Sequence, residues 1–159
     1  GPRKLARENN KQRWHKGVDL NTTAGNKGAG DPIVAIAPGV ITIVGFDQKI
    51  NVPGQPTRSD KIGYVVVKHD IPNDKKGVYE VSTRSMHLFL IADKPGGGRL
   101  ENGDRVEAGQ VLGYMGGIGT WPGAGSPGGT HLHFEVLVSK MEDGIKKYDS
   151  YTLAGDQGR

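Results

Sequence analysis

Glycine and proline divide this chain into short apolar runs that are rich in β-branched residues. With 26 Gly and 9 Pro, no window of ten or more residues shows a convincing helical period. About seven short strands joined by Gly-rich turns predict an all-β domain of the sandwich or barrel-like type. The clearest strands are expected at residues 33–37, 40–46, 63–68, 78–90, 111–115 and 131–138.

Three stretches between these runs are long for loops inside a compact domain. They cover residues 47–62, 92–103 and 116–129, and the third leads directly into the last predicted strand. Long loops of this kind are uncommon and often line a binding site. We therefore expect them to wall a groove.

The length and composition predict a single domain with a short arm. Residues 1–12 are polar and basic and predict a flexible arm, whereas residues 13–159 predict one domain that ends in a closing tail after residue 138. Cysteine is absent, which excludes disulfides and thiolate metal sites. No apolar run approaches the roughly 20 residues of a membrane span. No signal-peptide pattern is present. The Gly1-Pro2 start resembles the remnant of tag cleavage, in which case a natural export signal or an upstream domain would have been removed beforehand.

The formal net charge is +4, and basic residues cluster near the start of the chain. A nucleic-acid-binding module would interleave aromatic residues with such a cluster. Trp14 alone does not supply them, so we expect no nucleic-acid partner. A mild positive field also favours an anionic target such as a bacterial cell wall, whereas the plainer interpretation is a solvated, partly disordered arm.

Four of the five histidines fall into motifs whose residue types suit one metal ion. Residues 15–19 read HKGVD, residues 131–135 read HLHFE, and His87 lies between these motifs. Imidazole and carboxylate are ligands that zinc accepts, and a catalytic zinc typically takes three protein ligands and keeps one position for water. Two histidines and one aspartate would fill such a site, and two histidines would remain to handle protons.

Strand geometry predicts that the polar residues of the last motif share one face. Residues two apart in a strand point to the same side, so His131, His133 and Glu135 lie together while Leu132 and Phe134 face the core. The alternative for such a pair is two exposed or hydrogen-bonded histidines.

The other histidine positions are weaker signals when each is taken alone. His15 and Asp19 are four apart, which places them on one side of a helix or a strand. Gly17 between them disfavours a helix and allows the backbone to approach another group closely. Alone, this pair is more typical of a surface hydrogen bond, and His87 is more typical of a structural histidine. We expect the fifth histidine, His69, to be structural.

The two outer motifs, in this order, resemble those of the M23 metallopeptidases, the lysostaphin/LytM-like peptidoglycan endopeptidases. Residues 35–41 (AIAPGVI) are similar to the strand–turn–strand of that family, and residues 106–116 (VEAGQVLGYMG) to its glycine-rich approach to the last motif. Residues 85–88 (SMHL) are similar to the segment with its isolated catalytic histidine. The resemblance implies antiparallel β-sheets in a sandwich or barrel-like M23 domain, the duplicated hybrid motif, with a groove.

The same resemblance implies a set of roles for the site residues. One zinc ion per chain would be held by His15, Asp19 and His133. His131 and His87 would be the catalytic histidines that do not bind the metal. One would act as general base and the other would stabilise the oxyanion, and the order of these two roles stays open.

Three further residues are assigned to the surroundings of this site. Glu135 either orients a ligand imidazole from behind or forms an exposed salt bridge. A groove for a flexible, extended peptide needs walls, and we expect Tyr114 and Trp121 to provide them.

The implied activity is a zinc-dependent endopeptidase that cleaves peptidoglycan stem peptides or cross-bridges. The implied location is extracellular, periplasmic, in the cell envelope or on a virion. The alternatives are a non-catalytic binding or scaffold module of the same family, a phage version of the same hydrolase, and a phosphocarrier domain with paired histidines. The oligomeric state is not predicted.

Overall fold

The computed structural model describes residues 17–21, 28, 30–49, 61–71, 80–116, 130–143 and 145–151. Within these ranges the regular structure consists of β-strands, with no helix. The strands are β1 (Val18–Leu20), β2 (Pro32–Val34), β3 (Gly39–Lys49), β4 (Lys61–His69), β5 (Glu80–Ile91), β6 (Arg105–Val106), β7 (Val111–Met115), β8 (Leu132–Glu142) and β9 (Ile145–Tyr151).

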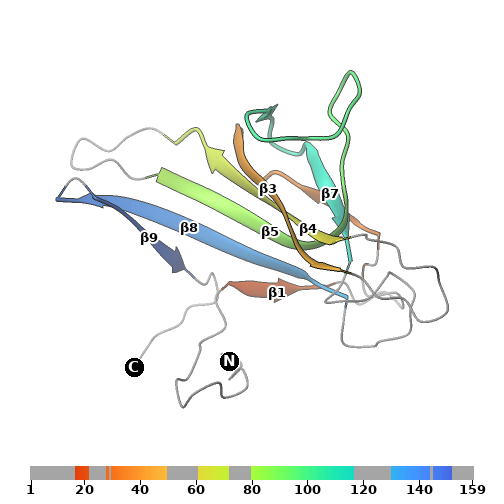
Figure 1. The fold of residues 1–159 in the computed structure, drawn as a ribbon, viewed down its shortest axis with the longest axis horizontal. Coiled ribbons are helices and arrows are strands. Elements are labelled where there is room, and N and C mark those ends of the chain that lie inside the picture. The colour runs from red at the N-terminus through yellow and green to blue at the C-terminus, as the bar shows by residue number, and fades with distance from the viewer. Residues whose placement is uncertain are drawn as a thin grey trace, which may run out of the picture.

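All the strand pairs are antiparallel, and together they form one open sheet (Figure 1). Its main path runs in the order β1-β8-β5-β4-β3-β6. β2 pairs with β7, β7 joins the sheet through β5, and β9 pairs with β8. The C-terminal end of β8 and the strand β7 lie at opposite ends of the sheet (Figure 1). The predicted all-β antiparallel fold is confirmed, and its strands belong to one sheet that branches at β5.

The branch occurs at His87, where β5 changes its partner. Pairing with β8 ends at Met86, which lies opposite His133, and pairing with β7 begins at Leu88. The register against β4 shifts at the same point, because Met86 and His87 together face the single residue Tyr64. Two residues opposite one is the geometry of a β-bulge, which bends a strand and redirects its side chains.

The core contains residues from both branches of the sheet, the one that continues from β5 to β8 and the one that continues from β5 to β7 and β2. Burying one large aliphatic or aromatic side chain contributes about 1.5–3 kcal/mol, so this shared core holds the junction of β5, β7 and β8 in place. Its buried members include Ile33 from β2, Ile41 from β3, Val65 and Val67 from β4, Leu88 and Ile91 from β5, Leu112 from β7, and Leu132 and Phe134 from β8.

Three strands, β1, β6 and β9, were not among the predicted ones. β1 has three residues and β6 has two, so neither is long enough to show a period. β8 continues to Glu142 and β9 follows it, so residues 139–142 and 145–151 of the predicted closing tail form the two strands of a hairpin.

Other predictions are partly corrected or lie outside the described residues. Residues 47–49 and 61–62 of the first predicted loop belong to β3 and β4. The arm at 1–12, residues 50–60, residues 117–129, His15 and Trp121 lie outside the described part. Where the structure is described, no helix is both long enough and apolar enough to cross a membrane.

Candidate metal and catalytic site

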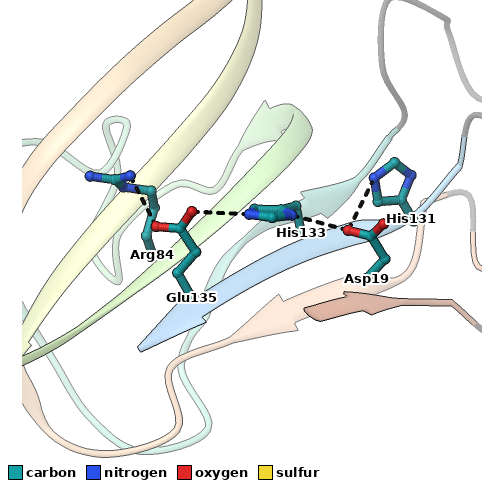
Figure 2. Close-up of polar contacts among 5 residues, drawn as sticks. All are labelled: Asp19, Arg84, His131, His133 and Glu135. Carbon is teal, nitrogen blue, oxygen red and sulfur yellow. Dashed lines mark hydrogen bonds and ion pairs between the residues drawn. The ribbon is translucent and has the colours of Figure 1, made fainter. Parts of the chain in front are cut away.

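The pairing of β1 with β8 brings Asp19 and His133 into direct contact. The two residues are opposite each other in the ladder although 114 positions separate them in the sequence. Directly opposite residues have Cβ atoms only about 4.5–5.5 Å apart, so the register places carboxylate beside imidazole. Asp19 Oδ1 lies 3.0 Å from His133 Nδ1 (Figure 2).

His131 reaches the same carboxylate from the residue that precedes β8. Its Nε2 lies 3.6 Å from Asp19 Oδ1. His131 is 6% exposed and His133 is 8% exposed, so both imidazoles are buried. Leu132 and Phe134 belong to the apolar core. The alternation predicted for this strand is therefore present, with the polar side chains gathered on one face.

His87 completes the group from the bulge in β5. Its ring centroid lies 4.7 Å from that of His131 and 6.0 Å from that of His133. The backbone links the same residues, because Gly116 N donates to His87 O at 2.7 Å and His131 N donates to Gly116 O at 3.1 Å. A Cβ at Gly116 would lie 3.0 Å from His87 O, so glycine permits this close approach.

The backbone of His87 is in the left-handed region, with φ of 64°. For a residue with a Cβ this conformation costs about 1–2 kcal/mol, and glycine does not bear that cost. Strain of this kind concentrates at functional sites, where the surrounding structure enforces it. Here the enforcing features are the bulge against β4 and the hydrogen bond from Gly116.

We expect His87→Gly to be more stable than His87→Ala by about 1 kcal/mol. Elsewhere in a strand the order is reversed, because glycine is about 0.5–1 kcal/mol worse than alanine. Urea unfolding of both variants measures the difference. Phe89→Gly and Phe89→Ala, two positions further along β5, provide the control and should follow the ordinary order. An alanine variant at His87 as stable as the glycine variant would contradict the strain.

The second nitrogen of His133 is held by Glu135. Nε2 lies 3.0 Å from Glu135 Oε1, and Glu135 Oε2 accepts a hydrogen bond from Arg84 Nη1 at 3.0 Å. Figure 2 shows Arg84, Glu135, His133 and Asp19 as one continuous row, with His131 beside Asp19. Glu135 thus contacts both an imidazole and a guanidinium. Its contact with His133 distinguishes it from a simple exposed salt-bridge residue.

The electrostatics around His133 favour positive charge. The hydrogen bond to Glu135 raises the pKa of His133 above its ordinary value, burial opposes this, and the hydrogen bond to Asp19 raises it further. Ionised carboxylate oxygens only accept hydrogen bonds, so a proton on each ring nitrogen would satisfy both contacts of the metal-free ring. A metal ion binds an imidazole nitrogen in place of its proton, and Nδ1 beside Asp19 is the nitrogen at which that exchange fits.

Gly17 allows the first motif to lie against the last. It has φ of +81°, and a Cβ at this position would lie 2.4 Å from Phe134 O, 2.8 Å from Glu135 Cγ and 3.1 Å from His133 Nε2. Contacts below 3.0 Å require backbone to move. A side chain at this position would therefore push β1 away from β8 and separate Asp19 from His133.

We expect Gly17→Ala to destabilise the protein by about 2–5 kcal/mol, from left-handed strain plus overpacking. Gly109→Ala is the matched control, because Gly109 has φ of +82° and a Cβ at that position would meet nothing within 4 Å. The control should lose only the conformational part, about 1–2 kcal/mol. Denaturant midpoints of the two variants give the steric part by difference. Equal losses would contradict the close approach at Gly17.

The remaining sequence-predicted residues are placed as follows. His69 is buried, with Nδ1 donating to Ala37 O at 3.1 Å and Nε2 accepting from Thr83 Oγ1 at 2.8 Å. Both of its nitrogens serve the fold, as expected for a structural histidine. Tyr114 packs against the core, and its ring centroid lies 6.4 Å from that of Phe89.

The donor set fits zinc as far as the structure describes it. Among the described residues no group of three or more His, Cys, Asp or Glu is arranged to hold a metal ion. Two of the three expected ligands, Asp19 and His133, are described and adjacent. Two ligands at about 2.0–2.1 Å from a tetrahedral zinc lie about 3.3 Å from each other, close to the 3.0 Å between Asp19 Oδ1 and His133 Nδ1.

Two solved structures from bacterial sources are similar to this chain. A protein of Ruminococcus gnavus assigned as the glycyl-glycine endopeptidase LytM is 23% identical, with a TM-score of 0.54 over 87% of this chain and 43% of that one. A mutant catalytic domain of the prophage-encoded M23 protein EnpA from Enterococcus faecalis is 22% identical, with a TM-score of 0.48 over 89% of this chain and 81% of that one. The chain thus spans less than half the length of the first of these proteins. No curated protein gives a significant match.

A sequence model of peptidase family M23 matches residues 13–145. The match contains both outer motifs and His87, whose described members the fold gathers around Asp19. The chain therefore belongs to peptidase family M23.

Proposed function

We propose that this chain is a zinc-dependent endopeptidase that hydrolyses peptide bonds in bacterial peptidoglycan, in the stem peptide or the cross-bridge. The observation that carries the proposal is the meeting of Asp19 with two imidazoles from the far end of the chain, His133 at 3.0 Å and His131 at 3.6 Å. Membership of family M23 supports it. The net charge of +4 suits an anionic cell wall, outside the cytoplasm or at a virion.

Asp19, His133 and His15 would hold the zinc. When bound, zinc polarises a carbonyl group and lowers the pKa of water enough to supply hydroxide near neutral pH. Asp19 adds negative charge to the ligand set, and Glu135 fixes the orientation of His133 by accepting the hydrogen bond from Nε2. These residues position the reaction rather than transfer protons.

Proton transfer belongs to His131, which lies against the ligand pair without being needed as a ligand. In its neutral form it accepts a proton from the attacking water, as general bases do in hydrolases. Its backbone is linked through Gly116 to the backbone of His87, which keeps the two residues next to each other. His87 donates a hydrogen bond to the oxyanion that develops on the scissile carbonyl, an interaction that commonly contributes about 3 kcal/mol.

Hydrolysis of purified cell walls tests the proposal. We expect the zinc-loaded protein to release new amino termini from insoluble peptidoglycan, because peptide bonds rather than glycosidic bonds are cut. A chelator should abolish the release and added zinc should restore it. Mass spectrometry of the muropeptides, from walls with direct and with glycine-containing cross-links, identifies the bond. Wall binding without new amino termini from the zinc-loaded protein would contradict the enzymatic function and indicate a scaffold.

A further inference from the structure

Arg84 lies at one end of the row of polar side chains shown in Figure 2. Arg84 on β5 is directly opposite Glu135 on β8, and its Nη1 donates to Glu135 Oε2 at 3.0 Å. The other carboxylate oxygen, Oε1, lies 3.0 Å from His133 Nε2. Each oxygen of Glu135 therefore contacts a different cationic or hydrogen-bonding partner.

The carboxylate of Glu135 is buried, and Arg84 offsets its charge. The side chain of Glu135 is 7% exposed, whereas that of Arg84 is 34% exposed. A carboxylate that leaves water is stable only when it is paired and hydrogen-bonded. Arg84 is the more exposed partner and neutralises the more deeply buried carboxylate of Glu135.

Glu135 can orient His133 only when its carboxylate does not rotate. The terminal torsion of glutamate is broad, so a carboxylate that is held at one oxygen still turns. A charge-assisted hydrogen bond at the second oxygen restricts that rotation and keeps Oε1 against His133 Nε2. An imidazole that donates from Nε2 presents Nδ1 to a metal, and Nδ1 is the atom beside Asp19.

One buried donor of Arg84 is left without a partner while another contacts Glu135. Its Nε is buried and has no hydrogen-bond partner among the described residues. Buried donors without partners are uncommon and call for a local reason. Here the guanidinium lies where Nη1 meets Glu135 rather than where all its donors are satisfied.

We propose that Arg84 is a positioning residue for the metal site: it locks the Glu135 carboxylate, and Glu135 holds His133 with Nδ1 directed at the zinc. This inference rests on the proposed function, because it requires that His133 binds zinc. It assigns a role to a residue outside the histidine motifs, on a strand that contributes no ligand.

Competition with a chromophoric chelator measures the zinc affinity of the full chain. We expect Arg84→Gln to bind zinc about tenfold more weakly, at the lower end of the roughly 10–100-fold typical for residues that support metal ligands. Lys68→Gln is the matched control, because Lys68 is a cation of the same sheet that pairs with Glu80 at 2.8 Å. The control should keep the affinity of the wild type.

Two further measurements separate positioning from a general structural role. Glu135→Gln should also weaken zinc binding, and Arg84→Gln should add little in that background, because neighbours in one network are not additive. In the zinc-loaded protein, NMR of the His133 ring should show an Nε2 proton that exchanges slowly in the wild type and faster in Arg84→Gln. Arg84→Lys keeps the charge but not the planar fork, and it should bind zinc with an affinity between those of Arg84→Gln and the wild type.

Wild-type zinc affinity in Arg84→Gln would overturn the inference. So would an equal loss of zinc affinity when Arg84→Gln is made in the wild type and in the Glu135→Gln variant. If Arg84→Gln does not fold, Arg84→Lys decides, and wild-type affinity with unchanged proton exchange in that variant would overturn the positioning role. A wild-type protein that binds no zinc would instead contradict the proposed function, so the two failures are distinguishable.

Discussion

His133→Ala should lose the bound zinc and, with it, the peptidase activity. The substitution removes the nitrogen that lies 3.0 Å from Asp19 Oδ1, and it leaves Glu135 without the imidazole that it holds. Loss of a supporting residue weakens metal binding by about 10–100-fold, so loss of a ligand should weaken it by more than about 100-fold. Elemental analysis after dialysis measures the zinc content directly.

Thermal unfolding gives the same prediction an independent readout. A ligand at 1,000 times its Kd stabilises the folded protein by about 4.1 kcal/mol, so zinc should raise the Tm of the wild type and not that of His133→Ala. His69→Ala is the control, because His69 is a buried histidine of the same sheet with both nitrogens hydrogen-bonded to the fold. It should lower stability yet keep the zinc-dependent rise. A zinc-dependent rise in His133→Ala would contradict the ligand assignment.

His131→Ala should keep the zinc and lose the reaction. His131 lies against the ligand pair, 3.6 Å from Asp19 Oδ1, with its ring 4.7 Å from that of His87. Removal of a general base typically lowers kcat by about 10²–10⁴-fold. Zinc content and kcat should therefore separate in this variant, whereas they fall together in His133→Ala.

The separation also tests the division of roles between the two histidines of the last motif. If His131→Ala lost its zinc, His131 would be a ligand and the general base would have to be His87. His87→Ala supplies the comparison, since it removes the second ring without altering β8. Zinc retained with full activity in His131→Ala would contradict any role for this ring in proton transfer.

Each strand that was predicted from the sequence contributes buried residues to the apolar core. Residues 111–115 form a strand with the predicted bounds, β3 and β4 contain their predicted runs, and β8 contains its predicted run except for His131. β9 was not predicted, because its sequence, IKKYDSY, mixes charged, polar and aromatic residues without a period-2 apolar face. Its backbone hydrogen bonds with β8, which no local pattern shows, account for the strand.

The part of the site that lies within one strand was predictable from the spacing of its residues. The alternation of residues 131–135 places both histidines and Glu135 on one face from local geometry alone. The contact between Glu135 and Arg84 was not predictable, because it depends on the register of β5 against β8 across 51 positions. The left-handed backbone of His87 likewise depends on the bulge against β4, a tertiary feature.

Anomalous diffraction at the zinc edge, on crystals of the zinc-loaded chain, locates the metal ion and its ligands in one measurement. We expect one zinc per chain, within about 2.0–2.2 Å of an Asp19 oxygen, His133 Nδ1 and a nitrogen of His15, with His131 and His87 beside it and outside bonding distance. An ion bound elsewhere, or His15 far from the Asp19–His133 pair, would be incompatible with a zinc site built from the two outer motifs.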